Sequence, residues 1–315
     1  MISILLFTFE IIAPIFLLIL LGSLLKRTSL INDIFVRQLS NFVFNISLPA
    51  LVFIKLSNVK IEQTFDITLI SSSIVLVLMF FIVSWVVAAV LTKKPEDQGS
   101  FIQGSFRSNY AIVGLAIILD MFGEESLGKA ALLLAFIMPL YNILAVIALT
   151  VPFHRDKENK FKVMFKEVLT NPLIVAAIVS VFFSMFELSV WTPIEKTLEY
   201  LAVIALPLAL IGIGATLEFE RIRKASMLAF SSTFLKIVLF PLIAILVGIA
   251  LDLSNNDMGI FFVLFATPTA IASFVMAEAM NCNSKLAGDI IAISTVLSVF
   301  TITIGLVVLK YFGYI

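Results

Sequence analysis

The chain alternates long apolar runs with short polar connections along its whole length. A helix that crosses a lipid bilayer needs about 20 predominantly apolar residues. Ten stretches of the 315-residue chain meet this requirement. They are residues 9–26, 38–57, 67–92, 101–122, 128–151, 170–187, 197–217, 227–251, 258–281 and 286–312. The pattern predicts an all-α membrane protein with ten transmembrane helices, numbered here as spans 1 to 10.

Composition supports a chain that resides in lipid. The chain is 61% hydrophobic and 13% charged, with a mean hydropathy of +1.14, whereas soluble domains are about 45–50% apolar and about 25% charged. The 21 basic and 21 acidic residues cancel, so no nucleic-acid partner is expected. The single Cys282 excludes an intramolecular disulfide framework. No basic residue precedes the first apolar run, which is therefore interpreted as a true span rather than a signal peptide.

Lysine and arginine residues are distributed unevenly over the connections between spans. Fourteen of them follow the odd-numbered spans, and five lie on the other side. Because cytoplasmic loops carry an excess of basic residues, both termini are predicted to be extracytoplasmic. The longest connection, residues 154–169 with His154 at its start, is predicted to lie in the cytoplasm.

Prolines indicate an internal repeat. Pro14 and Pro172 are 158 positions apart, and so are Pro49 and Pro207. At the same offset "SNYAIVG" in span 4 aligns with "ATPTAIA" in span 9. The sequence therefore predicts two five-helix units, residues 1–153 and 170–315, joined by a linker at 154–169. Because five is odd, the second unit enters the membrane from the opposite side, which is the inverted-repeat architecture common among secondary transporters.

Spans 4 and 9 are the candidates for interrupted helices at the middle of the membrane. Pro268 in span 9 removes a backbone donor and clashes with the preceding turn, and neighbouring hydroxyl groups can satisfy the freed backbone atoms. These hydroxyls belong to Thr267, Thr269 and Ser273. Span 4 lacks a proline but holds four poor helix formers, namely Ser105, Ser108, Asn109 and Gly114.

Two basic residues fall inside predicted spans, where a charge costs about 2.5–3.5 kcal/mol and is typically functional. Arg107 is interpreted as a substrate ligand or a member of an ion pair, or as a side chain that snorkels to the interface. Lys236 is expected to contact substrate or to pair with Glu278 or Asp120. Asn109 could bind a carboxylate or cap a broken half-helix.

Further polar residues complete the candidate substrate site. Asn45 and Asn142 are amides within spans 2 and 5, and either substrate contact or interhelical hydrogen bonding explains them. Pro49 is expected to shape its helix and to line the cavity. The full set of candidate substrate-binding residues is Arg107, Ser108, Asn109, Tyr110, Gly114, Thr267, Pro268, Thr269, Ser273, Asn45, Pro49, Asn142 and Lys236.

No enzyme motif accompanies these residues. "GEESLGKA" approaches the phosphate-loop pattern, but Ala130 replaces the hydroxyl residue and Glu124 and Glu125 would repel phosphate. No HExxH, GxSxG or cysteine–histidine cluster occurs. No enzymatic activity, cofactor or metal site is therefore expected.

Four stretches together resemble a known family. They are "NFVFNISLPALVF", "SFRSNYAIVGLAIILDMFG", "LPLALIGIGATLE" and "ATPTAIASFVMAEAMNCNSKLAGDIIAISTVLS". They resemble the auxin efflux carrier family, which includes plant auxin exporters and bacterial malonate or malate permeases. The resemblance implies a ten-helix fold like that of sodium/proton antiporters and bile-acid symporters, with broken spans 4 and 9 that cross. It also implies a bacterial inner membrane. Ser108, Ala116 and Ser273 stand where prolines are usual, so a plant-type substrate is not supported.

These observations predict a secondary transporter for a small organic anion, such as a mono- or dicarboxylate. Alternating access would occur about a site where spans 4 and 9 cross. The alternatives are an ion-coupled symporter or antiporter of the same fold for another solute, an anion channel, and a membrane sensor that does not transport. The channel and a cation antiporter are less well supported, because the spans hold few polar residues and the crossover motifs hold no acid. A homodimer is left open.

Overall fold

The computed structural model describes residues 2–57, 65–153, 170–217 and 225–315. The predicted linker at 154–169, including His154, lies outside the described residues. Within the described ranges every named element is helical, and the one backbone bridge outside helices joins Ser108 to Thr269. Six helical stretches are long and apolar enough to cross a membrane. They are Asp33–Ser57, Ile67–Leu91, Tyr110–Thr150, Thr192–Thr216, Met227–Ala250 and Ser284–Tyr311. That ten segments cross stays a prediction.

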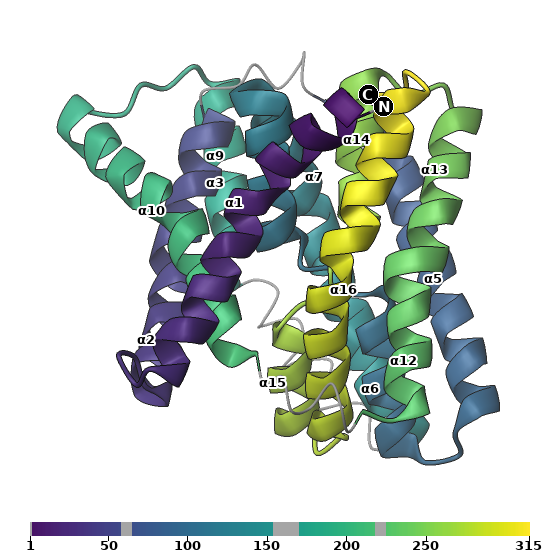
Figure 1. The fold of residues 1–315 in the computed structure, drawn as a ribbon. Helices are drawn as coiled ribbons and strands as arrows, with labels where there is room; N and C mark the ends of the chain where they lie inside the picture. The colour runs from purple at the N-terminus through teal and green to yellow at the C-terminus, as the bar shows by residue number, and fades with distance from the viewer. Residues whose placement is uncertain (1, 58–64, 154–169, 218–224) are drawn as a thin grey trace.

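The helices follow one another in the order seen in Figure 1. In the first half of the chain they are α1 (Ile2–Arg27), α2 (Asp33–Phe42), η1 (Val43–Ser47), α3 (Leu48–Ser57), α5 (Ile67–Leu91), α6 (Pro95–Phe106), η2 (Tyr110–Gly114), α7 (Leu115–Thr150) and η3 (Val151–Phe153). In the second half they are α9 (Pro172–Met185), α10 (Thr192–Thr216), α12 (Met227–Phe234), η4 (Leu235–Leu239), α13 (Phe240–Ala250), α14 (Asn255–Ala266), α15 (Ala272–Ala279) and α16 (Ser284–Tyr311). The segments η1, η2 and η4 are single π-helical turns.

The connection expected between spans 4 and 5 is shorter than the sequence predicts. Helix α7 continues through the expected loop, and only Gly123 departs from helical geometry, with φ 78° and ψ −172°. Glycine reaches this conformation without the steric penalty of a side chain. One residue therefore bends the chain where a loop of several residues was expected.

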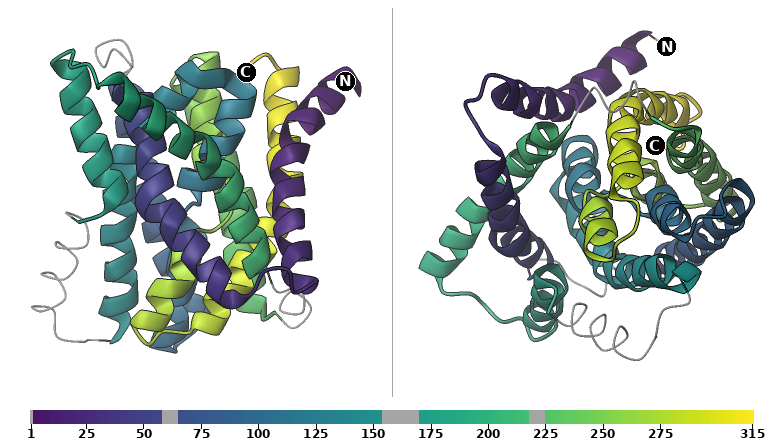
Figure 2. Two further views of the ribbon diagram at one scale, coloured as in Figure 1. Left: turned by 90° about the vertical axis from the view of Figure 1, so that its left-hand side faces the viewer. Right: turned by 90° about the horizontal axis from the view of Figure 1, so that it is seen from below.

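The helices form two bundles, and each bundle takes helices from both halves of the chain. The first, here called the panel bundle, contains α1, α2–η1–α3, α9 and α10, which pack against one another. The second, here called the crossover bundle, contains α5, α6, α7 and α12 to α16. The view from below in Figure 2 separates the two. The two halves of the sequence are thus interleaved in space rather than folded side by side.

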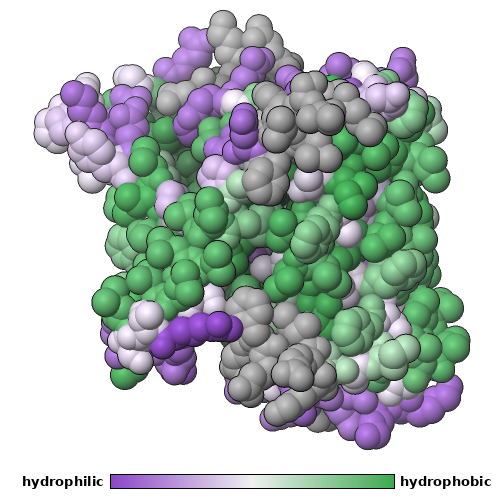
Figure 3. All heavy atoms as spheres, in the orientation of Figure 1, coloured by the Kyte–Doolittle hydropathy of each residue, from purple (hydrophilic) through white to green (hydrophobic). Residues whose placement is uncertain are grey.

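The outer surface supports a membrane setting for both bundles. Apolar side chains cover the middle of the molecule, and polar ones gather at its two ends (Figure 3). Large apolar side chains such as Val203, 75% exposed, and Leu246, 67% exposed, point outward. The two termini lie at the upper end of Figure 1, and the connections after α1 and α5, with Lys26, Arg27, Lys93 and Lys94, lie at the lower end. This arrangement agrees with the predicted separation of basic residues, while the cytoplasmic assignment of the lower end stays a prediction.

A network of charged groups joins three helices. Lys129 on α7 forms ion pairs with Asp66, at 3.5 Å, and with the buried Asp257 of α14. Asp66 also caps α5 by accepting hydrogen bonds from the N–H groups of Thr68, at 2.9 Å, and Leu69, at 3.0 Å. Partial burial raises the pKa of the Asp66 carboxyl, but these two donors and the Lys129 charge outweigh burial and leave its pKa below the ordinary value.

Loss of this network is expected to lower stability in a pH-dependent way. Lys129→Met removes both ion pairs. The pair with the buried Asp257 is expected to contribute about 1.5–3 kcal/mol and the more exposed pair with Asp66 about 0.2–1 kcal/mol, so a destabilisation of about 2–4 kcal/mol is expected at pH 6. Because the folded pKa of Asp66 is lowered, its stabilisation is complete above its unfolded pKa of about 3.9 and is lost as pH falls through the folded value. Thermal unfolding in detergent from pH 6 to pH 3 should therefore show the wild type approaching the variant. Exposed Lys196→Met is the matched control, and equal melting of both variants at pH 6 would contradict the prediction.

Candidate functional site

Two interrupted helices meet at the centre of the crossover bundle. Helix α6 ends at Phe106 and the chain resumes as a π turn at Tyr110, while α14 ends at Ala266 and α15 begins at Ala272. The two extended stretches run antiparallel and pair through their backbones. Asn109 N–H donates to the carbonyl of Pro268 at 2.8 Å, and Ala270 N–H donates to the carbonyl of Arg107 at 3.4 Å. Span 4 is therefore broken although it lacks a proline.

Side-chain hydroxyls satisfy the carbonyls that the interruptions leave without helical partners. The Ser108 hydroxyl contacts the carbonyl of Leu264 and the hydroxyl of Thr267. Thr269 donates from Oγ1 to the carbonyl of Gly104 at 2.6 Å, near the end of α6. Each break thus supplies hydroxyls to the other, which explains why polar residues that disfavour helices gather at both places.

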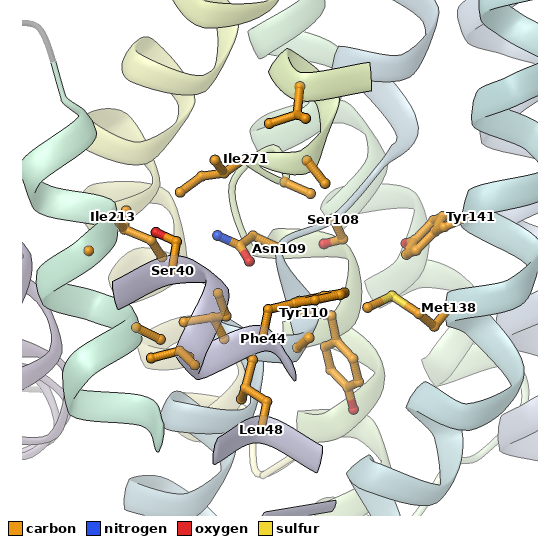
Figure 4. Close-up of a pocket in the computed structure, with 18 of the residues that line it drawn as sticks. Ser40, Phe44, Leu48, Ser108, Asn109, Tyr110, Met138, Tyr141, Ile213 and Ile271 are labelled. Atoms are coloured by element: carbon orange, nitrogen blue, oxygen red, sulfur yellow. The ribbon is translucent and has the colours of Figure 1, made fainter. Parts of the chain in front are cut away.

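A cavity of about 310 Å³ lies between the two bundles, beside the crossover (Figure 4). The crossover bundle contributes Arg107 to Ile112, part of α7 and the start of α15 to its wall, and the panel bundle contributes α2, η1 and α10. Ser40 and Asn41 of α2 are exposed and mark its outer edge. Small-molecule sites typically have volumes of about 300–1,000 Å³, so this cavity suits a compact solute.

Arg107 lies in the wall of this cavity and is only 5% exposed. Its Nη2 donates to Asn142 Oδ1 at 2.7 Å and its Nη1 to Gln103 Oε1 at 3.3 Å. Its Nη1 also contacts the thioether sulfur of Met276 at 2.7 Å. All three acceptors are neutral, and no ion pair of Arg107 with an acid occurs among the described residues. The guanidinium therefore neither snorkels to the surface nor is neutralised, and it retains its charge and further donors for a ligand.

The backbone adds to the positive character of the cavity. The segments that begin at Tyr110 and Ala272 both point their N-terminal ends at it, and Ala111, Ile112 and Ile271 also line it. The first N–H groups of a helix have no intrahelical acceptor, and its N-terminus carries about half a positive charge. Asn109 directs its side-chain amide into the same space (Figure 4). Of the described residues that line the cavity, none is Asp or Glu.

The predicted site residues fall into three groups. Those that line the cavity are Arg107, Ser108, Asn109, Tyr110 and Asn142. Those that lie at or beside the crossover without lining the cavity are Gly114, Thr267, Pro268, Thr269, Ser273 and Lys236. Asn45 and Pro49 belong to neither group, because they are not in the cavity wall and Asn45 donates to the carbonyl of Asn41 at 2.8 Å.

The structure gives Lys236 and Gly114 specific neighbours. The predicted pairing of Lys236 with Glu278 or Asp120 is not found, because its partners are the carbonyl of Phe265 and the hydroxyl of Ser108; its contact with substrate stays a prediction. Gly114 makes room for an aromatic ring, since a Cβ at that position would lie 2.5 Å from Cδ2 of Tyr110. Neither arrangement could be predicted from spacing along the chain.

Sequence reasoning missed several polar residues of the cavity wall, namely Ser40, Asn41, Tyr141 and Asn171. Asn41 precedes Asn45 by one helical turn, and Tyr141 adjoins Asn142. Each therefore lies next to a residue that the sequence predicted for the substrate site. Asn171 also caps α9 by accepting from Leu173 N–H at 3.0 Å. No group of three or more His, Cys, Asp or Glu in the described ranges is arranged to hold a metal ion.

Apolar helices, two interrupted helices and a solute-sized cavity beside their crossing define a helical membrane transport protein. The chain belongs to the membrane transport protein family, that of the auxin efflux carriers, which it matches over residues 7–306. It is accordingly a transporter rather than an enzyme, and it acts on a substrate within a lipid bilayer.

Its relatives include three that match over nearly their full length. An uncharacterized transporter of Methanocaldococcus jannaschii is 22% identical over 302 residues, covering 94% of this chain and 96% of the relative. The uncharacterized transporter YfdV of Escherichia coli K12 is 23% identical over 288 residues, covering 89% and 91%. A Rhizobium meliloti protein named "Putative malonate transporter" is 25% identical over 303 residues, covering 93% and 92%.

Proposed function

We propose that this protein is a secondary transporter for a small organic anion, a mono- or dicarboxylate, which binds in the cavity beside the crossover. The observation that carries the proposal is the charge of that cavity. Its wall holds a buried guanidinium and two half-helix N-termini, and no acid among its described residues. The positive charge of such a site has no negative partner until an anion enters the cavity.

The chemistry of the wall suits a carboxylate. An arginine fork can donate two parallel hydrogen bonds to one carboxylate, which adds geometric specificity to the charge interaction. The Asn109 amide and the N–H groups at the start of η2 and α15 are additional donors. A relative named as a malonate transporter favours a dicarboxylate.

A second cavity supports alternating access. It measures about 490 Å³ and is lined by residues of α1, α3, α7 and α10, among them Pro14, Lys55, Asp120 and Pro207. On α10, Leu208 and Gly212 line the first cavity and Leu206 and Leu210 line the second. We infer that the crossover bundle moves against the panel bundle, so that the site opens to one cavity and then to the other.

Membrane topology and repeat structure belong to the same proposal. Ten spans in two inverted units, residues 1–153 and 170–315, would place the two crossing breaks in equivalent positions. Extracytoplasmic termini and a bacterial inner membrane follow the distribution of basic residues and the family.

Ligand-dependent stability provides the primary test. Purified protein in detergent is heated with malonate, malate, acetate or choline at equal ionic strength. A ligand that binds only the folded state at 100 times its Kd stabilises by about 2.7 kcal/mol, so at least one carboxylate should raise the melting temperature and choline should not. Proteoliposomes should then take up the labelled carboxylate that gives the largest shift. Stabilisation by choline alone, or by none of the carboxylates, would contradict the proposal.

A further inference from the structure

Lys236 is a buried ammonium that the proposed anion site does not use. It lies in the π turn η4, is 1% exposed and does not line the cavity. Its Nζ donates to the carbonyl of Phe265 at 2.8 Å and to the Ser108 hydroxyl at 3.1 Å. Both acceptors are neutral, and the ion pairs formed within the described ranges do not include Lys236.

The position of this ammonium follows from the break in α14. In an unbroken helix the carbonyl of Leu264 would accept from residue 268 and that of Phe265 from residue 269. Pro268 has no N–H to give, and Thr269 N–H donates instead to Ser294 Oγ at 3.1 Å. The Ser108 hydroxyl therefore contacts the carbonyl of Leu264, and Lys236 donates to the carbonyl of Phe265.

These oxygen atoms form a site suited to a cation. The carbonyls of Leu264 and Phe265 and the hydroxyls of Ser108 and Thr267 lie together at the C-terminal end of a half-helix. A helix C-terminus carries about half a negative charge. In transporters with interrupted helices, half-helix C-termini and unwound carbonyls are where coupling Na⁺ or H⁺ binds.

We propose that the Lys236 ammonium is a built-in cation that occupies this oxygen site in place of Na⁺, so that the protein carries its anion without sodium. The inference rests on the proposed anion transport and adds its ion dependence. A tethered ammonium and a free Na⁺ cannot share the same carbonyl oxygens, because they would overlap and repel each other. The π turn is consistent with this role, since such turns occur frequently at functional sites.

The connection to the anion site runs through Ser108. Its hydroxyl accepts from Lys236, and the same residue forms part of the cavity wall one position from Arg107. The ammonium therefore links the C-terminal end of α14 to Ser108 in the interruption between α6 and η2. A bound metal cation could otherwise make the same link. In wild-type protein a side chain of the protein itself makes this link.

Cation-dependent melting tests the inference without any organic anion. Wild-type protein and Lys236→Ser are heated in NaCl and in N-methylglucamine chloride at equal concentration. The serine variant vacates the oxygen site and adds a hydroxyl, so bound Na⁺ should stabilise the folded state and raise its melting temperature by at least about 3 °C, whereas the wild type should melt identically in both salts. Lys236→Met, which fills the space without charge or oxygen, is the matched control and should be indifferent to Na⁺.

Each outcome decides the inference. Stabilisation of the wild type by Na⁺, or no response of a folded Lys236→Ser, would overturn it. If Lys236→Ser does not fold, uptake by wild-type proteoliposomes decides instead: unchanged carboxylate uptake after complete replacement of Na⁺ supports the inference, and loss of uptake overturns it. A sodium response gained by Lys236→Ser in a protein that no carboxylate stabilises would contradict the proposed function alone.

Discussion

Replacing Arg107 with glutamine is expected to abolish carboxylate binding and leave the protein folded. The substitution removes the only full positive charge in the described wall of the proposed anion cavity. Losing one partner of a buried, hydrogen-bonded charge pair costs about 2–5 kcal/mol, and each 1.4 kcal/mol is tenfold. Affinity for the carboxylate should therefore fall by about 30-fold at least, and uptake by proteoliposomes should fall to background.

The fold should survive this change because Arg107 has neutral partners. Asn142 and Gln103 accept from its guanidinium, and the glutamine amide can still donate to one of them. Removing an uncompensated buried charge also relieves its desolvation cost. Thermal unfolding without ligand should thus be close to that of the wild type.

Two further variants sharpen the test of Arg107. Arg107→Lys keeps the charge but loses the planar fork, so its affinity should lie between those of wild type and Arg107→Gln. Arg37→Gln, at an exposed position of α2, removes a charge outside the cavity and should bind normally. Wild-type affinity in a folded Arg107→Gln would show that the anion does not contact this residue.

Alanine at Gly214 is expected to have the largest effect on folding. Helices α1 and α10 approach closely, and a Cβ at Gly214 would lie 1.7 Å from the carbonyl oxygen of Ile19. Overpacking usually costs about 1–3 kcal/mol. Here the obstacle is backbone, which cannot move aside like a side chain, so a loss of more than about 3 kcal/mol is expected.

The close contact is reciprocal, which strengthens this prediction. On the facing helix a Cβ at Gly22 would lie 2.0 Å from the carbonyl oxygen of Ile211. Small residues commonly permit such approach between membrane helices. Both glycines would have to be retained for α1 and α10 to form the panel bundle.

Gly212→Ala on the same helix is the matched control. Its Cβ would lie 3.6 Å from Ser40 Oγ, which is an ordinary contact. Purification in detergent followed by thermal unfolding should give a monodisperse, wild-type-like Gly212→Ala and an aggregated or strongly destabilised Gly214→Ala. Equal stability of the two variants would contradict the prediction.

The residues of span 4 and span 9 differ in how far sequence could determine their structure. Pro268 dictates a break in span 9 by itself, because it lacks an N–H and clashes with the preceding turn. Span 4 has only poor helix formers at the corresponding place, and these favour a break without forcing one. There, the backbone of Arg107 and Asn109 pairs with residues 268–270, and this pairing replaces the helical hydrogen bonds that span 4 gives up. The second break therefore depends on the first, across about 160 residues of chain.

The polar residues of the cavity illustrate the same limit. Asn45 and Asn41 are one turn apart in sequence, yet Asn41 lines the cavity and Asn45 does not. Asn45 lies within η1, and a π turn holds an extra residue and changes which face later positions occupy. An argument from helical periodicity assumes a regular α-helix. It therefore cannot tell which of the two asparagine side chains, Asn41 or Asn45, lines the cavity.

By itself the sequence determined that this is a helical membrane protein, where its apolar segments lie, that span 9 is interrupted, and to which family it belongs. These properties depend on composition, local sterics and extended motifs, all of which involve residues close together in the sequence or the chain as a whole. Only the tertiary structure decided how the backbone of span 4 pairs across its break, that Arg107 and Lys236 have neutral partners, and which side chains share a cavity. Those outcomes depend on contacts between residues far apart in sequence, where hydrogen-bond geometry and packing in three dimensions select one partner among many.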